Sequence, residues 1–163
     1  LKQQQIDKLR SAYEAARSVG REILIEIIAS KHGPMDDKTT ARAVNEVYAA
    51  GLKPDWWKLE PQASSNAWRE IESVIASRDP YCRGIVLLGL EAPEAELQKA
   101  FNAVADAKMV KGFAVGRTIF NEAAQNWLPG KIDDSTAIQL MADKFGTLVQ
   151  MWEKARGDRR SNQ

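Results

Sequence analysis

The segment EILIEII at residues 22–28 decides the fold class of this chain. It is almost continuously apolar, rich in isoleucine and too short for a typical helix, so it predicts a strand that is covered on both faces. Similar short segments follow at residues 55–60, 84–90 and 110–115. The segments between them have the three- and four-residue apolar spacing of helices. Strands that alternate with helices predict an α/β fold with one parallel sheet.

The helices between these strands have recognisable start and stop residues. A first helix at residues 6–19 precedes the first strand and can end at Gly20. We expect the other helices to be capped or started by Asp36 or Asp37, by Ser64 or Ser65, by Pro93, near Thr118, and by Asp133 or Asp134. The repeat of ~30 residues is the length of one strand-helix unit.

Four strands are half of a closed parallel barrel, which has eight strands and ~250 residues. A free-standing sheet of the flavodoxin-like kind is the alternative, but it leaves the first helix without a preceding strand. We therefore interpret residues 1–156 as one domain, the C-terminal half of a TIM (β/α)8 barrel that contains strands five to eight, and residues 157–163 as a disordered tail. Either the N-terminal half-barrel is missing or a second copy closes the ring. Because an open parallel edge promotes aggregation, we expect a homo-oligomer.

The composition excludes several classes of function. The net charge is +1, with 23 basic and 22 acidic residues, which gives no electrostatic argument for nucleic acid or an anionic membrane. The apolar segments are too short to span a bilayer. A single cysteine fits a reducing compartment, so we expect a cytoplasmic protein. One histidine and one cysteine cannot build a zinc site, and we expect neither a metal nor a cofactor.

Lys58 is the first candidate for chemistry. It lies in PDWWKLEP at residues 54–61, where the alternation of a strand places Trp56, Lys58 and Glu60 on one face. Pro61 marks the end of the strand, so Lys58 lies near the C-terminal rim, where barrel active sites form. A partly desolvated lysine there can be a neutral amine that attacks a ketone. The alternative is an exposed lysine that pairs with Glu60.

Glu26 is the second candidate, because a carboxylate inside an apolar strand is costly unless it is paired or needed. It could transfer protons during a reaction. The alternative is a structural partner for a buried lysine, and a Lys–Glu pair would serve both purposes.

The strand ends contain a candidate anion site. Gly116 and Arg117 end the fourth strand and open a helix, and Gly89 has the matching place on the third strand. Barrels often bind phosphate after strands seven and eight. The alternative is an ordinary tight turn. Lys31 follows the first strand on the same rim and is a further candidate for substrate binding, while His32 beside it either contacts substrate or is solvated.

Four segments resemble the aldolase-type domain of myo-inositol catabolism: EILIEII (22–28), PDWWKLEP (54–61), DPYCRG (79–84) and KGFAVGRTIF (111–120). The resemblance covers nearly the whole chain. In that family the domain commonly follows a ribokinase-like sugar kinase domain, in a fusion of 5-dehydro-2-deoxygluconokinase with 5-dehydro-2-deoxyphosphogluconate aldolase. The family domain is about twice as long as this chain, which agrees with the strand count.

More distantly, the strand ends resemble the Schiff-base tagatose-bisphosphate aldolases. Lys58 and Glu60 match the Lys-Val-Glu pattern that supplies the imine lysine of that class, and Glu26 matches a glutamate that handles protons. Gly116 and Arg117 match the residues that bind phosphate. Lysines that the class uses on earlier strands have no counterpart here, so an isolated chain can be inactive.

The resemblance implies retro-aldol cleavage of 6-phospho-5-dehydro-2-deoxygluconate to dihydroxyacetone phosphate and malonate semialdehyde. Lys58 would form an imine with the ketone, and Glu26, with Glu60, would complete the catalytic group. Arg117 and backbone groups near Gly89 and Gly116 would hold the phosphate. The alternative function is a non-catalytic sugar-phosphate-binding or assembly domain beside the carbohydrate kinase. No Gly-rich Walker loop occurs, so we do not expect this chain to bind ATP in that way.

Overall fold

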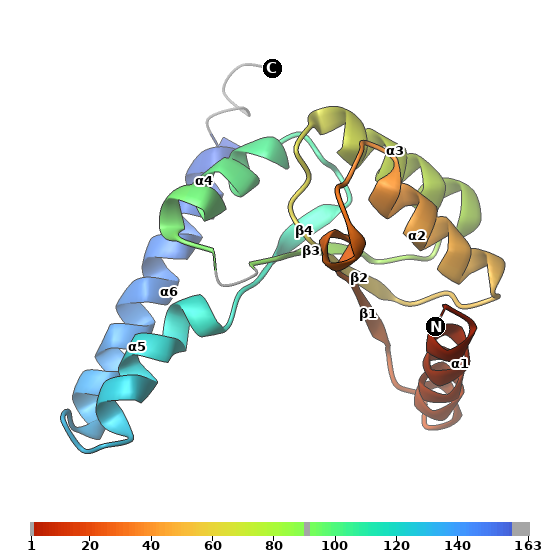
Figure 1. The fold of residues 1–163 in the computed structure, drawn as a ribbon. Coiled ribbons are helices and arrows are strands. Elements are labelled where there is room, and N and C mark those ends of the chain that lie inside the picture. The colour runs from red at the N-terminus through yellow and green to blue at the C-terminus, as the bar shows by residue number, and fades with distance from the viewer. Residues whose placement is uncertain (1, 90–91, 158–163) are drawn as a thin grey trace.

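A computed structural model describes residues 2–89 and 92–157, which form an α/β arrangement with one four-stranded sheet and flanking helices (Figure 1). In chain order the elements are α1 (Lys2–Ser18), β1 (Leu24–Ile27), the short 3-10 helix η1 (Ala29–His32), α2 (Thr39–Ala49), β2 (Trp56–Leu59), α3 (Ser65–Arg78), β3 (Gly84–Leu88), α4 (Glu94–Ala103), β4 (Val110–Ala114), α5 (Arg117–Trp127) and α6 (Asp134–Gly157). The predicted order of a leading helix, four strand-helix units and a closing helix is confirmed. The predicted strand end at position 90 and residues 158–163 of the predicted tail lie outside the described residues. Gly157, which was expected to begin the tail, is instead the last residue of α6.

The sheet is parallel throughout, and its strand order β1-β2-β3-β4 follows the sequence. Each pair of neighbouring strands is therefore joined by a helical connection, as in repeated βα units. The pairing sets Glu26 level with Lys58, Lys58 level with Val86, and Val86 level with Gly112. This register aligns the polar positions of β1 and β2 side by side.

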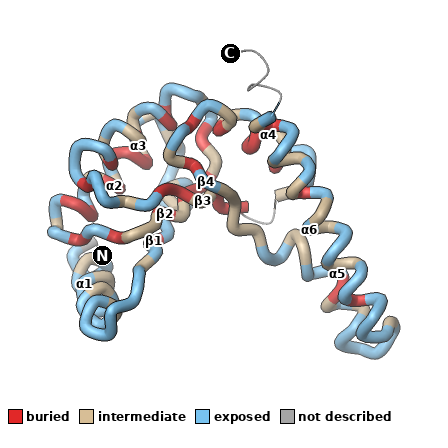
Figure 2. The backbone as a smooth tube through the Cα atoms, turned by 180° about the vertical axis from the view of Figure 1, so that it is seen from behind, coloured by how far each residue is buried: buried red, intermediate tan, exposed pale blue. Residues whose placement is uncertain are grey.

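The hydrophobic core lies between one face of the sheet and the helices α2, α3 and α4. Figure 2 shows the buried positions gathered where the strands meet these helices, while α1 and the far ends of α5 and α6 are mostly exposed. Trp57 of β2 is fully buried on this face, packs edge-on against Tyr48 of α2, and donates a 2.9 Å hydrogen bond from Nε1 to the tyrosine hydroxyl. Alternate residues of β2 therefore point to the core and to the opposite face.

The prediction that the first strand is covered on both faces is wrong. Leu24 is 46% exposed, Glu26 is also exposed, and Ile25 between them is buried. The physical reason is that β1 is an edge strand and that α2 and α3 lie together on the outside of the arch that Figure 1 shows. No helix among the described residues covers the inner face of the arch over β1 and β2, so this face is open.

The two ends of the arch are held by different contacts. At one end, Arg17 of α1 forms an ion pair with Asp55 and donates to the carbonyl of Lys53. At the other end, the ring of Trp152 of α6 packs edge-on against Phe101 of α4, with 5.4 Å between the ring centroids. The helices α5 and α6 run side by side away from the sheet (Figure 1).

The helix caps agree only in part with the sequence. Ser64 caps α3 as predicted, because its hydroxyl accepts a hydrogen bond from the amide of Ala67. The expected cap of α2 by an aspartate is wrong, since α2 begins at Thr39 without a side-chain cap. Asp36 instead accepts hydrogen bonds from the Lys38 amide and the Thr39 hydroxyl, so it stabilises the turn before the helix. None of the helices among the described residues is long and apolar enough to cross a membrane.

Candidate functional site

Lys58 and Glu26 form an ion pair on the open face of the sheet. The distance from Lys58 Nζ to Glu26 Oε2 is 2.8 Å, and the two side chains are 24% and 36% exposed. They meet because β1 and β2 are in register at these residues and both side chains point away from Trp57 and the helices. The structure thus brings together the two residues that the sequence offered as amine and proton carrier.

The carboxylate of Glu60 does not pair with Lys58, so the alternative of a Lys58–Glu60 ion pair is wrong. Glu60 is 1% exposed. Its Oε1 accepts a 2.9 Å hydrogen bond from the amide of Ser30, and its Oε2 accepts a 2.6 Å hydrogen bond from the Ser30 hydroxyl. Both carboxylate oxygens therefore bind one residue of η1, the short helix that follows β1.

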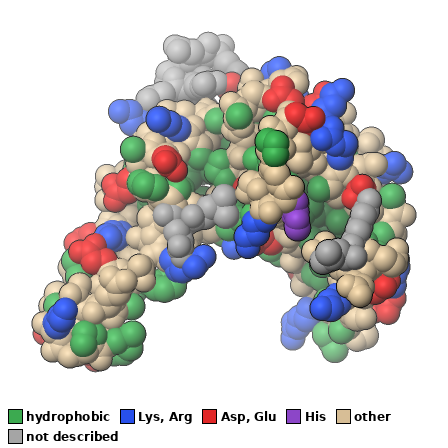
Figure 3. Space-filling model, viewed as in Figure 1, with side chains coloured by type: hydrophobic (Ala, Val, Ile, Leu, Met, Phe, Trp, Pro, Cys, Tyr) green, Lys and Arg blue, Asp and Glu red, His purple; other side chains and the backbone are tan. Residues whose placement is uncertain are grey.

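Lys31 and His32 complete η1, and both are exposed. His32 and Glu26 line the same cavity of about 760 Å³, which runs along the free edge of β1 between α1 and α2. Figure 3 shows the single histidine beside basic side chains on the hollowed side of the arch. The rim after β1 therefore places an imidazole beside the cavity that Glu26 lines, with the exposed Lys31 next to it in the chain.

Gly89 and Gly116, at the ends of β3 and β4, differ in how closely other atoms surround them. A Cβ atom on Gly89 would lie 2.7 Å from Cγ2 of Val115, so close packing explains the absence of a side chain there. A Cβ atom on Gly116 would make only an ordinary 3.4 Å contact with Phe120. Gly116 is the N-cap of α5, and Arg117 is its exposed first residue. Both glycines follow the C-terminal ends of their strands, as Glu60 follows the C-terminal end of β2.

A family model described as "Uncharacterized protein conserved in bacteria (DUF2090)" matches residues 1–156. The chain belongs to the DUF2090 family. A search of curated proteins found no match. The matched range is the same as the domain predicted from the sequence, so all elements of the DUF2090 chain described above, apart from the last residue of α6, lie within the family match.

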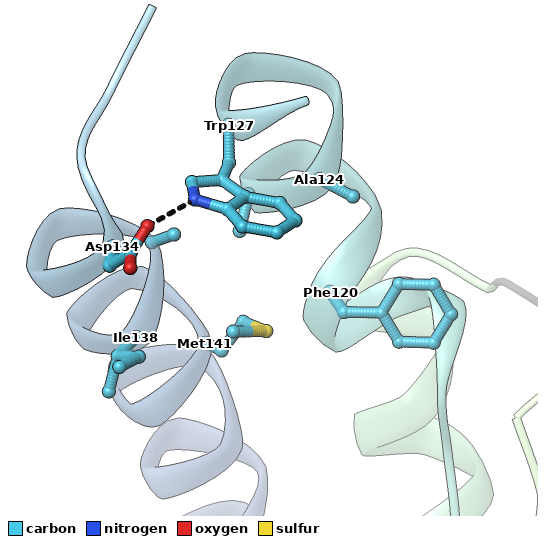
Figure 4. A pocket seen from close by; sticks show the side chains of 8 residues that line it. Phe120, Ala124, Trp127, Asp134, Ile138 and Met141 are labelled. Carbon is cyan, nitrogen blue, oxygen red and sulfur yellow. Dashed lines mark hydrogen bonds between the residues drawn. The ribbon is translucent and has the colours of Figure 1, made fainter. Parts of the chain in front are cut away.

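Ser30 of the DUF2090 chain is not among the residues predicted from the sequence. A serine in a short connecting segment has no periodic pattern, and only its position two residues after the strand segment 22–28 could have drawn attention to it. Trp127 is 45% exposed. Trp127 lines a cavity of about 400 Å³ between α5 and α6 with Phe120, Ile138 and Met141, and its Nε1 donates a 2.7 Å hydrogen bond to Asp134 (Figure 4).

Within the described ranges of the DUF2090 chain, no three His, Cys, Asp or Glu side chains gather in a way that could hold a metal ion. On the open face the Lys58 amine and the Glu26 carboxylate lie within hydrogen-bonding distance of each other. An amine with a carboxylate in hydrogen-bonding distance can exchange a proton with it and add to a carbonyl carbon. This is the chemistry that the arrangement can carry out.

Proposed function

We propose that this chain is the C-terminal half of a TIM (β/α)8 barrel, with β1 to β4 as strands five to eight. Four parallel strands in sequential order support this proposal, since the same order continued through four more strands would close a ring. The open inner face, which carries Leu24, Glu26 and Lys58, corresponds to the inside of such a barrel. In a closed ring the free edges of β1 and β4 would both be paired.

The order of the helices favours a partner half that begins and ends with a strand. A closed barrel has one helix over each gap between neighbouring strands. If a second copy closed the ring, α5 and α6 of one copy would meet α1 of the other over a single gap. A partner unit of four strands and three helices would leave α1 and the α5–α6 pair at separate gaps. We therefore propose a different half-barrel as the partner.

On this barrel we propose the Schiff-base aldolase reaction. The observation that carries the proposal is the 2.8 Å contact between Lys58 Nζ and Glu26 on the open face. Glu26 accepts a proton from the lysine, and the neutral amine adds to the C5 ketone of 6-phospho-5-dehydro-2-deoxygluconate. Glu26 returns the proton to the hydroxyl of the carbinolamine, which leaves as water and gives the iminium ion.

The iminium ion then accepts the electron pair of the C3–C4 bond. Glu26 removes the proton of the C3 hydroxyl as this bond breaks, which releases malonate semialdehyde and leaves an enamine on Lys58. Protonation of the enamine and addition of water release dihydroxyacetone phosphate and restore the amine. Arg117, Gly116, Gly89 and Lys31, on the same rim, are the proposed contacts of the phosphate. A ribokinase-like kinase domain is the proposed neighbour that supplies the phosphorylated substrate.

Imine trapping tests this function. Full-length protein is incubated with dihydroxyacetone phosphate and sodium borohydride, and the modified peptide is located by mass spectrometry. We expect one reduced adduct on Lys58, none in Lys58→Met, and an unchanged adduct in the control Lys111→Met, which removes an exposed strand lysine from β4. An adduct on a different lysine, or none in the unaltered protein, contradicts the role of Lys58.

The same variants decide on the alternative function. A non-catalytic sugar-phosphate-binding or assembly domain can also contain a structural Lys–Glu pair, so the contact between Lys58 and Glu26 fits it as well. If Lys58→Met cleaves the substrate as fast as the unaltered protein and still binds phosphate esters, the binding function is the correct one. We expect cleavage to fall by at least about a thousandfold, because the covalent route is lost.

A further inference from the structure

The buried carboxylate of Glu60 has a geometry that separates it from the Lys58–Glu26 pair. Glu60 directly follows β2, and strand alternation alone would place it on the face of Lys58. Leu59 and Glu60 are nevertheless both buried in succession, so the alternation stops at the end of the strand. The side chain of Glu60 is thereby directed into the protein, under the segment that follows β1.

Both oxygens of this carboxylate are bound by Ser30. The amide donates to Oε1 at 2.9 Å and the hydroxyl donates to Oε2 at 2.6 Å. Hydrogen bonds to a carboxylate are shorter and stronger than those between neutral groups, and a buried carboxylate that loses them is strongly disfavoured. The two bonds tie the end of β2 to the middle of η1, two residues after the segment 22–28 that contains Glu26.

The segment held in this way carries two polar rim residues. Lys31 and His32 come directly after Ser30, and the carbonyl of Ser30 accepts a hydrogen bond from the amide of Gly33. His32 lines the cavity that Glu26 also lines. The position of Ser30 therefore sets where the Lys31 cation and the His32 imidazole stand relative to the ion pair.

We propose that Glu60 is a positioning residue that holds η1 through Ser30, and that it does not transfer protons to the substrate. The part of this proposal that concerns substrate binding rests on the proposed aldolase function. Its role in holding η1 is independent of any reaction. In the reaction, Glu60 and Ser30 act as one unit that places Lys31 for contact with the phosphate ester.

The test compares Ser30→Ala, Glu60→Gln and the double variant in the full-length protein. Ser30→Ala removes one of the two bonds from an exposed position, so the variant is expected to fold, which circular dichroism checks. The control is Glu72→Gln, because Glu72 likewise accepts a backbone hydrogen bond, at 2.6 Å from the amide of Met109, but lies on α3 away from η1.

Hydrogen exchange gives the first readout. We expect the backbone amides at positions 30 and 33 to exchange at least about tenfold faster in Ser30→Ala and Glu60→Gln than in the unaltered protein. Their exchange rates should be unchanged in Glu72→Gln. Unchanged exchange in both test variants overturns the proposal, whether or not the protein is an aldolase.

Steady-state kinetics give the second readout. We expect both single variants to raise KM for the phosphorylated substrate about five- to tenfold with kcat within about twofold, and the double variant to resemble either single one. If Glu60→Gln instead lowers kcat while Ser30→Ala does not, Glu60 transfers protons and the proposal is wrong. If the unaltered protein gives no lysine adduct, the aldolase function fails, and hydrogen exchange still decides whether Glu60 holds η1.

Discussion

Replacing Asp55 tests how α1 is held to the sheet. The carboxylate of Asp55 accepts a 2.8 Å hydrogen bond from the amide of Ile23 and forms a 2.9 Å ion pair with Arg17. An amide left without its partner costs about 1–3 kcal/mol. The ion pair is worth only about 0.5–1 kcal/mol, because the side chains of Arg17 and Asp55 are 38% and 19% exposed. We expect Asp55→Ala to lower the free energy of unfolding by about 2–3 kcal/mol.

Asp55→Asn separates the two contributions. The asparagine oxygen can still accept the hydrogen bond from Ile23, so mainly the attraction to Arg17 is lost. We therefore expect Asp55→Asn to cost about 1 kcal/mol or less at pH 7. Asp7→Asn is the control, because Asp7 is an exposed carboxylate on α1 that accepts a hydrogen bond only from Gln3 among the described contacts. Its effect is expected to stay within about 0.5 kcal/mol.

The loss in Asp55→Asn depends on pH. Burial raises the pKa of Asp55, but the hydrogen bond from Ile23 and the ion pair with Arg17 together outweigh burial and hold this pKa below its ordinary value. A carboxyl group whose pKa is lower in the folded state stabilises the protein fully above its unfolded pKa of about 3.9. The contribution is lost as the pH falls through the folded pKa. The difference between the unaltered protein and Asp55→Asn should therefore shrink below about pH 4.

Urea denaturation monitored by tryptophan fluorescence measures these differences at pH 7, 5, 4 and 3. The midpoint is expected to change while the slope of the free energy with urea stays constant, since the folded and unfolded states expose the same surface as before. If Asp55→Ala is within about 0.5 kcal/mol of the unaltered protein, or if the loss in Asp55→Asn is as large at pH 3 as at pH 7, the reasoning about this carboxylate is wrong.

Two further predictions concern the sheet and its core. Gly84 has a φ of +147°, and a Cβ atom there would lie 2.7 Å from the backbone oxygen of Met109, so Gly84→Ala should lower the free energy of unfolding by at least about 2 kcal/mol. Gly112→Ala, with nothing within 4 Å of its Cβ, should lower it by less than about 1 kcal/mol. Thermal unfolding compares the two variants. Tyr48→Phe leaves the buried Nε1 of Trp57 without its acceptor and should lower the free energy of unfolding by about 1–3 kcal/mol, and urea unfolding that shows no loss would contradict this.

The order of the elements could be predicted because it depends on local patterns. Each strand is a short apolar segment and each helix has its own spacing and stop residue, as with Gly20 after α1 and Ser64 before α3. What the pattern could not give is the number of covered faces. Apolar residues lie on both faces of β1, with Ile25 and Ile27 on the covered face and Leu24 on the other, and the same residues would suit a strand covered on both sides. The pattern therefore fits a strand with one covered face as well as a strand with two.

The candidate site was predictable to the extent that strand alternation holds. Alternation placed Glu26 and Lys58 on defined faces of their strands, and the parallel register then brought them to 2.8 Å. At the end of β2 the alternation stops, and for this reason the direction of Glu60 could not be read from the sequence. Its partner Ser30 could not be found either, because a hydrogen bond between two chain segments has no pattern in either of them.

The open face also affects the conditions under which the proposed reaction can take place. An ion pair with side chains 24% and 36% exposed is screened by water, so the pair of Lys58 and Glu26 contributes little to the stability of the chain by itself. Enclosing it with a second half-barrel would strengthen the attraction between the charges and raise the cost of burying them, unless the partner supplies further polar contacts. A partner unit that enclosed the pair with apolar side chains alone would therefore destabilise the ring. On this proposal the partner half contributes polar groups of its own to the site, and for the same reason we expect imine formation on Lys58 only when that partner is present.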